Sequence, residues 1–478
     1  MNYFLFSQSF TRGTRIFLLL AILLLNFGSS GAGVAYAAPP IHDDFAAAKT
    51  ITGIEYLDLN VNTTEATPSD TTPNVDDPAN FPCDGFNHLA GFASVWYKYT
   101  PPAAQTISLD TIGTDYDTYI AVWTGSRGSL NLVICNDETF SGFSELSVDV
   151  NAGTTYYIEI AQFNDGLATD NIGGSLDFHA YITNTNVRIG GTLRGRYFIP
   201  ESGGLRRSFL NLNNGPVEIN NVAGNQIIAA ERVIYKVNNV YTSFSEMMGL
   251  PHSQLNTTYW LPWYNNVDLD TQLRIGNVSA SPATVTITIG GVPMGSPIQL
   301  AVGASTRVSF AGVNNGPVKI VSTQNIVAAE RVIQKNVNRV PVSFSEMMGL
   351  PNTQLSTIYW MPWYNNVGLD TQLRLGNVSA TTATIRIFIG GTEMTGSPFT
   401  LAAGASIRKS YPGIDNGPVR IESTVNIVAA ERVIYKINNS STSFSEMMGL
   451  PNGLLDSRYW MPWYNNVDLD TQLRFALP

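Results

Sequence analysis

Residues 259–267 read YWLPWYNNV, and residues 359–367 and 459–467 repeat this stretch as YWMPWYNNV. Each copy follows an SFSEMMGLP segment (residues 243–251, 343–351 and 443–451) and, further back, an AAERVI segment. A period of about one hundred residues is the length of a whole domain, longer than the unit of a solenoid. The sequence therefore predicts a tandem array of similar domains, an organisation that suits reach, adhesion or scaffolding.

Short alternating segments fill each repeat. Val285, Ile287 and Ile289 alternate with threonines before a Gly-Gly turn, which predicts a half-buried strand. About seven or eight such strands per repeat favour an immunoglobulin-like β-sandwich. We expect repeat domains at residues 187–280, 283–380 and 383–478, with the abrupt FALP ending leaving open a truncated third domain. A second phase, which starts each unit at the YW segment, makes residues 279–282 a loop instead of a domain junction.

The first residues predict export. Arg12 and Arg15 precede an apolar run that ends in Ala35-Tyr36-Ala37, the order of a secretory signal peptide spanning residues 1–37. An uncleaved N-terminal anchor is the alternative. Loss of the two arginines takes the net charge from −10 to about −12, and this acidic balance argues against nucleic acid as a partner. We therefore expect a secreted or cell-surface protein with no membrane span after cleavage.

Residues 39–185 are expected to form a separate all-β domain. Period-two runs at residues 94–99, 119–123, 130–135, 146–150 and 155–161 predict strands of a sandwich. The domain holds the two cysteines of the chain, Cys83 and Cys135, which predict a disulfide in an oxidising compartment.

The same domain carries a resemblance to a known family. SVWYKYT (94–100), DTIGTDYDTYIAVWTG (110–125), LVICND (132–137) and AGTTYYIEIA (152–161) follow one another in the order of the bacterial pre-peptidase C-terminal domain. This resemblance implies a jelly-roll-type sandwich that accompanies exported proteins as a non-catalytic accessory module.

Two sets of side chains are candidates for ligands. Asp115, Asp117 and Asp137 lie on predicted loops, and such oxygen donors suit Ca²⁺, although they also cap turns. The repeated aromatic residues suit stacking on sugar rings, or else packing in the core or between domains. These residues are Trp260, Trp263, Tyr264, Trp360, Trp363, Tyr364, Trp460, Trp463 and Tyr464.

Two further segments have structural interpretations. SFSEMMGLP resembles a capped helical turn. Glu330 and Arg331 are adjacent in a predicted strand, so their side chains point to opposite faces and are expected to bond neighbouring strands or the arginine of the TQLR segment.

Catalytic motifs were sought and none was found. The sequence has neither an H-E-x-x-H zinc motif nor a G-x-S-x-G nucleophile elbow, and its four histidines are scattered. A glycosidase can hide in two carboxylates without fixed spacing, so a secreted hydrolase is kept as the remotest alternative. We expect a non-catalytic adhesion or attachment protein that contacts extracellular protein or glycan, with a carbohydrate-binding accessory protein as the main alternative.

Overall fold

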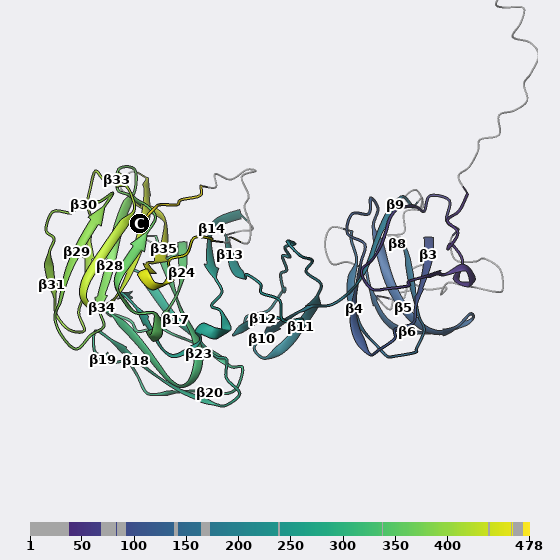
Figure 1. Ribbon diagram of the computed structural model, residues 1–478, viewed down its shortest axis with the longest axis horizontal. Helices are drawn as coiled ribbons and strands as arrows, with labels where there is room; N and C mark the ends of the chain where they lie inside the picture. The colour runs from purple at the N-terminus through teal and green to yellow at the C-terminus, as the bar shows by residue number, and fades with distance from the viewer. Residues whose placement is uncertain are drawn as a thin grey trace, which may run out of the picture. The chain divides into compact units, whose positions relative to one another are not determined.

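The computed structural model describes residues 38–67, 83, 92–137, 142–163, 173–237, 240–336, 338–437, 440–459, 461 and 472–478 (Figure 1). Regular structure in these residues is almost entirely β-strand, which confirms the predicted all-β class. The helices described are single 3-10 turns at Phe45–Ala47, His252–Gln254, Asn352–Gln354 and Asn452–Leu454, and no described helix is long and apolar enough to cross a membrane. The predicted signal peptide lies outside the described residues.

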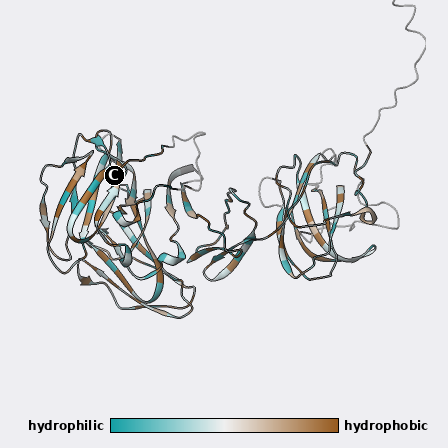
Figure 2. Cartoon of the chain, viewed as in Figure 1, coloured by the Kyte–Doolittle hydropathy of each residue, from teal (hydrophilic) through white to brown (hydrophobic). Residues whose placement is uncertain are grey.

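Contacts between Cα atoms divide the chain into two compact units, residues 1–182 and 183–478. Alternation of apolar and polar residues is visible along many strands of both (Figure 2). This alternation is the expected consequence of burying one face of a strand and leaving the other in water.

The first unit contains two sheets. One sheet has the order β1-β3-β8-β5-β6 (Lys49–Thr50, Phe92–Tyr99, Tyr156–Gln162, Thr118–Ser126, Ser129–Asn136), and the other the order β2-β9-β4-β7 (Tyr56–Asn62, Ser175–Ile182, Gln105–Asp110, Glu145–Val150). Val95, Ile107 and Phe178, from both sheets, are fully buried in one apolar cluster. The five strands predicted from alternation are all present, and the two sheets enclose a shared core as a sandwich does.

The second compact unit contains two complete copies of one strand arrangement. In the first copy, which we call repeat unit A, the strands are β15 (Asn256–Leu261), β16 (Tyr264–Asn265), β17 (Asp270–Asn277), β18 (Ala283–Ile289), β19 (Val292–Pro293), β20 (Ile298–Leu300), β21 (Ser305–Val308), β22 (Asn314–Asn315), β23 (Val318–Lys335) and β24 (Pro341–Met348). A two-residue strand, β25 (Leu350–Pro351), then pairs with β15.

The next copy, repeat unit B, has the same order. Its strands are β26 (Ser356–Met361), β27 (Tyr364–Asn365), β28 (Asp370–Asn377), β29 (Ala383–Ile389), β30 (Thr392–Glu393), β31 (Phe399–Leu401), β32 (Ser406–Lys409), β33 (Asp415–Asn416), β34 (Val419–Ile437) and β35 (Ser440–Met448), followed by β36 (Leu450–Pro451). The long strands β23 and β34 organise the two units. The first half of β23 pairs with β15 and β18, and its second half pairs with β17 and β24.

An incomplete copy precedes unit A. This half-unit consists of β10 (Thr185–Ile189), β11 (Thr192–Tyr197), β12 (Val217–Asn221), β13 (Ala230–Val237) and β14 (Val240–Met248). In sequence, β12 and β13 correspond to the two halves of β23, but here they belong to separate sheets, β11-β10-β12 and β13-β14.

The strand pairing bears on the two phases of the repeat. Residues 279–282 connect β17 to β18, and both strands pair with β23, so one sheet crosses the expected junction between residues 280 and 283. This connectivity is that of the second phase, with a half-unit, two whole units and a partial copy. As boundaries of independently folding domains, 187–280, 283–380 and 383–478 stay predictions.

One local expectation is wrong. The SFSEMM segments are not helical turns but strands, contained in β14, β24 and β35. Their side chains alternate, with Phe344 and Glu346 on one face of β24 and Ser345 and Met347 on the other. Each unit packs against a neighbour through these strands, and the contacts so formed outweigh the local preference for a cap.

Candidate functional site

The joints between repeat units hold buried polar and charged side chains that recur along the chain. Strand β24 lies beside β14 on one side and β35 on the other. The backbone N–H of Glu346 donates to Ser245 Oγ at 2.9 Å, and the N–H of Glu446 donates to Ser345 Oγ at 2.8 Å. Because the same bond recurs one repeat later, each unit attaches to the next in the same head-to-tail manner.

A buried charged cluster lies beside the serines at the joint between units A and B. Glu330 of unit A lies within electrostatic range of Arg374, Arg432 and Glu446 of unit B, and all four are largely buried. Arg432 Nε donates to Glu446 Oε1 at 2.6 Å, which makes an ion pair across β34 and β35. The equivalent cluster at the previous joint contains Glu231, Arg274, Arg331 and Glu346.

Burial shifts the proton affinities of these groups. It raises the pKa of Glu330 well above its ordinary value, and the nearby charge of Glu446 raises it further. Burial, with repulsion from Arg432, lowers the pKa of Arg374 to about 9. At Glu431, the equivalent of Glu330 in unit B, burial raises the pKa to about 7, against the attraction of Arg474. Glu330, at the joint between units A and B, and Glu431 therefore favour the neutral form more than an ordinary glutamate does.

The shifted carboxyl group of Glu431 leads to a pH prediction. Its pKa is higher in the folded chain than the ordinary 4.5, so its proton stabilises the fold fully below pH 4.5, and that stabilisation is lost as pH rises through about 7. A pKa raised from 4.5 to about 7 corresponds to a contribution on the order of 3 kcal/mol. We expect Glu431→Gln to remove this contribution, so that urea unfolding between pH 4.5 and 8 loses less stability in the variant. Identical pH dependence in both chains would contradict the assignment.

The aromatic candidates contribute mainly to packing. Tyr259, Tyr264, Tyr359 and Tyr364 are fully buried. The hydroxyl of Tyr359 donates to the carbonyl of Ile427 at 2.7 Å, and that of Tyr259 makes the same bond to Ile326. These tyrosines fix β26 and β15 to the long central strands.

In the first two motifs, the first tryptophan lies at a joint. Trp260 is buried in the core of unit B, and its Nε1 donates to Asn352 Oδ1 at 2.9 Å. Trp360 makes the equivalent bond to Asn452. The indole thus spans the boundary between consecutive units, which is the packing role that the sequence left as an alternative to sugar binding.

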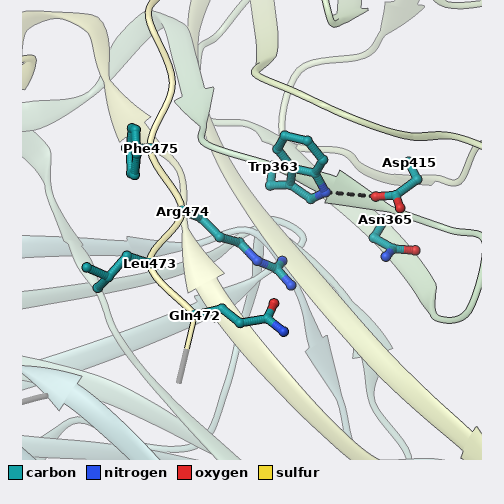
Figure 3. Close-up of a pocket in the computed structure, with 7 residues that line it drawn as sticks. All are labelled: Trp363, Asn365, Asp415, Gln472, Leu473, Arg474 and Phe475. Atoms are coloured by element: carbon teal, nitrogen blue, oxygen red, sulfur yellow. Dashed lines mark hydrogen bonds between the residues drawn. The ribbon is translucent and has the colours of Figure 1, made fainter. Parts of the chain in front are cut away.

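The second tryptophan is partly exposed. Trp363 Nε1 donates to Asp415 Oδ1 at 2.8 Å, and its ring lines a shallow pocket of about 370 Å³ together with Asn365, Arg474 and Phe475 (Figure 3). Trp263 occupies the equivalent place, with the guanidinium of Arg374 5.1 Å from its ring centre. Of the predicted binding residues that the structure describes, Trp263, Trp360 and Trp363 are therefore partly exposed and lie beside polar groups. The last set, Trp460, Trp463 and Tyr464, lies outside the described residues.

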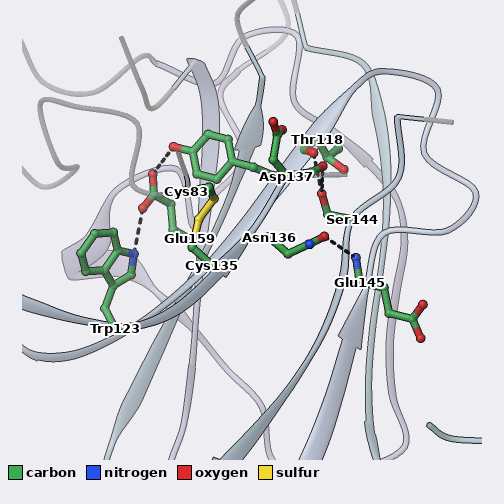
Figure 4. The surroundings of a disulfide bond; sticks show 10 residues. Cys83, Thr118, Trp123, Cys135, Asn136, Asp137, Ser144, Glu145 and Glu159 are labelled. Atoms are coloured by element: carbon green, nitrogen blue, oxygen red, sulfur yellow. Dashed lines mark hydrogen bonds between the residues drawn. A yellow bond between two sulfur atoms is a disulfide. The ribbon is translucent and has the colours of Figure 1, made fainter. Parts of the chain in front are cut away.

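The first unit contains the predicted disulfide. Cys83 and Cys135 are bonded, with their Cα atoms 5.2 Å apart (Figure 4). Nearby, the fully buried carboxylate of Glu159 accepts hydrogen bonds from the hydroxyl of Tyr119 and from Trp123 Nε1. These bonds solvate the carboxylate inside the protein, which a buried charge requires.

The predicted calcium ligands have partners in the protein. Asp115 Oδ1 accepts the N–H of Ser175 at 2.8 Å, and the carbonyl oxygens of Asp117 and Asp137 accept from Phe163 N–H and Ser144 Oγ. Among the described residues, no group of three or more His, Cys, Asp or Glu side chains is arranged to hold a metal ion. Binding of Ca²⁺ by these three residues stays a prediction.

The serines at the joints were not predicted as functional residues from the sequence. Ser245 and Ser345 stand in polar segments with no catalytic or ligand motif around them, and only their recurrence one hundred residues apart was visible. The Glu–Arg pair was correctly expected to lie in a strand and to bond neighbouring strands. That Glu330 faces the following repeat unit depends on how the units stack.

Comparisons with known proteins identify no family. No family model matches the chain, and no curated protein matches it. Among solved structures, a GH2 beta-galacturonidase from Eisenbergiella tayi is 9% identical with a TM-score of 0.15, covering 54% of this chain and 35% of its own. An anti-sigma factor domain-containing protein is 12% identical with a TM-score of 0.13, and the match covers 55% of this chain and 85% of that protein. The M60 catalytic domain with two CBM51 domains from Clostridium perfringens ZmpB is 8% identical with a TM-score of 0.14, and the match covers 84% of this chain and 37% of that protein. The chain thus spans about a third of the first of these, and similarities this low support no argument about fold or function.

Proposed function

We propose that this protein is a secreted or cell-surface, non-catalytic attachment protein, in which stacked repeat units present contact surfaces. The observation that carries the proposal is the recurrence of one joint between consecutive units, with the same serine bond each time and a Glu–Arg cluster that is buried between units A and B. These polar side chains connect one unit to the next, a use that fits a scaffold.

The test uses the purified chain, fluorescently labelled, against immobilised extracellular proteins and polysaccharides, alongside a screen of peptidase and glycosidase substrates. We expect saturable binding to one class of surface and no turnover of any substrate. Turnover that follows the pure protein through gel filtration would refute the non-catalytic role, and absence of binding to every surface would refute attachment.

A carbohydrate ligand is the second candidate, favoured by the partly exposed Trp363 beside Asn365 and Asp415 (Figure 3). Such a ring, flanked by hydrogen-bonding groups, is suited to stacking on a sugar. A pre-peptidase-like role for residues 39–185 and a calcium requirement belong to the same proposal. Both are tested by repeating the binding measurements with residues 39–185 deleted and with a chelator present.

The carbohydrate candidate gives a specific prediction. If Trp363 stacks on a sugar, Trp363→Ala is expected to lower glycan affinity at least about tenfold, the equivalent of about 1.4 kcal/mol. Val367→Ala is the matched control, because Val367 is exposed in the same segment but does not line the pocket. Glycan-array binding of both variants, with circular dichroism to check the fold, decides the question. Equal affinity of wild type and Trp363→Ala would exclude this ring as the sugar contact.

A further inference from the structure

The half-unit exposes a face that is buried in units A and B. Val217 and Ile219 of β12 are 51% and 39% exposed, whereas their equivalents Val318 and Ile320 are fully buried. Their equivalents in unit B, Val419 and Ile421, are also fully buried. Exposed apolar side chains at positions that are otherwise buried indicate a surface from which a partner is missing.

The missing partners can be named from the pairing in the complete units. In unit A, β15 pairs with the first half of β23 and β17 pairs with its second half. In the described part of the half-unit, β12 pairs only with β10, and β13 pairs only with β14. The half-unit therefore lacks the counterparts of β15 and β17, and two strand edges remain available for pairing.

Residues 459–475 have the sequence of those two strands. They match residues 259–275 except at Met461 and Phe475, and the structure describes Tyr459, Met461 and residues 472–475 of this stretch. Leu473 and Phe475 are 58% and 87% exposed, although their equivalents Leu373 and Leu375 are fully buried. In Figure 3, Leu473 and Phe475 point to one side of the chain, while Gln472 and Arg474 point to the other, the side of Trp363. Residues 472–475 thus present the alternating face of β28 without a core to cover it.

The joint surfaces at the two ends of the stack are complementary as well. On β35, Ser443, Ser445 and Met447 are exposed, although their equivalents on β24 are buried against unit B. On β14, Phe244 and Glu246 are exposed, whereas Phe344 and Glu346 are buried against the half-unit. The free face of β35 and the free face of β14 are thus the two halves of the joint that recurs inside the chain.

We propose that the described ends of this stretch, Tyr459 and residues 472–475, pair with the half-unit of a second copy of this chain, so that the copies associate head to tail. By analogy with units A and B, Tyr459 would lie opposite Ile219, and Leu473 opposite Glu231. The partner is a second copy because β24 separates β14 from β35, which places the donor and acceptor faces on opposite sides of the stack. Such an interface is heterologous and adds one molecule after another instead of closing a symmetric dimer.

An engineered disulfide tests the interface directly. Within the chain, the Oγ atoms of Ser243 and Ser343 are 3.3 Å apart, and those of Ser343 and Ser443 are 3.4 Å apart. If the joint recurs between molecules, Ser443 of one copy meets Ser243 of the next. We therefore expect the full-length double variant Ser243→Cys/Ser443→Cys to form a ladder of covalent oligomers under mild oxidation. Ser343 stands between the two positions within one molecule, so an internal bond cannot compete.

Controls separate this interface from incidental oxidation. Each single cysteine variant is expected to give no product larger than a dimer, since a ladder needs both positions. Adding Leu473→Asp and Phe475→Asp to the double variant should reduce the ladder at least about tenfold, whereas adding Val292→Asp, an exposed site on β19, should leave it unchanged. A double variant that stays monomeric over a wide range of concentration while folded would overturn the proposal, and so would a ladder insensitive to Leu473→Asp/Phe475→Asp. Head-to-tail assembly does not depend on the proposed attachment function. A chain that forms the ladder but binds no surface would therefore support assembly and contradict attachment.

Discussion

Replacement of Tyr359 by Ala is expected to lower the free energy of unfolding by about 3–5 kcal/mol, the range for removing a large buried aromatic ring. Tyr359 is fully buried in the core of unit B, and its hydroxyl donates to Ile427. The change leaves a cavity and also leaves the carbonyl of Ile427 without that donor. Urea unfolding followed by tryptophan fluorescence measures the effect.

The chain provides its own control for this prediction. Tyr459 occupies the same position of the third motif but is 54% exposed. Its hydroxyl accepts the N–H of Asp456, a local bond that Tyr359 also makes with Ser356. At concentrations where the chain is monomeric, we expect Tyr459→Ala to cost less than about 1 kcal/mol. Equal losses at the two positions would show that burial does not distinguish the copies.

Most of the strands could be predicted from the sequence, because buried and exposed residues alternate along a strand with a period of two. Val318 and Ile320 were expected in the core with Lys319 between them facing outward, and the structure has that pattern. The prediction succeeds because apolar and polar residues alternate in the sequence wherever one face of a strand is buried and the other faces solvent.

The joints could not be predicted from the sequence, because they form between units and not within one strand. Ser245 and Glu330 are polar residues that lie buried where a neighbouring unit packs against them. Periodicity within one strand carries no information about a partner one hundred residues away. The phase of the repeat was ambiguous for a related reason, since a tandem sequence reads equally well from any starting point and only the pairing of β17 and β18 with β23 distinguishes the possibilities.

The same comparison between copies predicts that Arg432→Ala costs about 3–5 kcal/mol, whereas Arg232→Ala costs about 0–1 kcal/mol. Both arginines bond the glutamate on the neighbouring strand through Nε at 2.6 Å. The side chains of Arg432 and Glu446 are only 6% and 5% exposed, so removal of the guanidinium leaves a buried carboxylate without its ion-pair partner. Arg232 and Glu246 are 33% and 49% exposed, and water replaces the lost interaction.

Urea unfolding of both variants near neutral pH measures this difference. A third variant, Arg432→Ala/Glu446→Ala, separates the loss of a charge from the loss of packing. If the cost arises from the stranded carboxylate of Glu446, removing that carboxylate restores part of the stability, because no buried charge is then left unpaired. A double variant no more stable than Arg432→Ala would instead assign the cost to packing. In that case the buried pair would contribute to the joint by filling space and not through its charge.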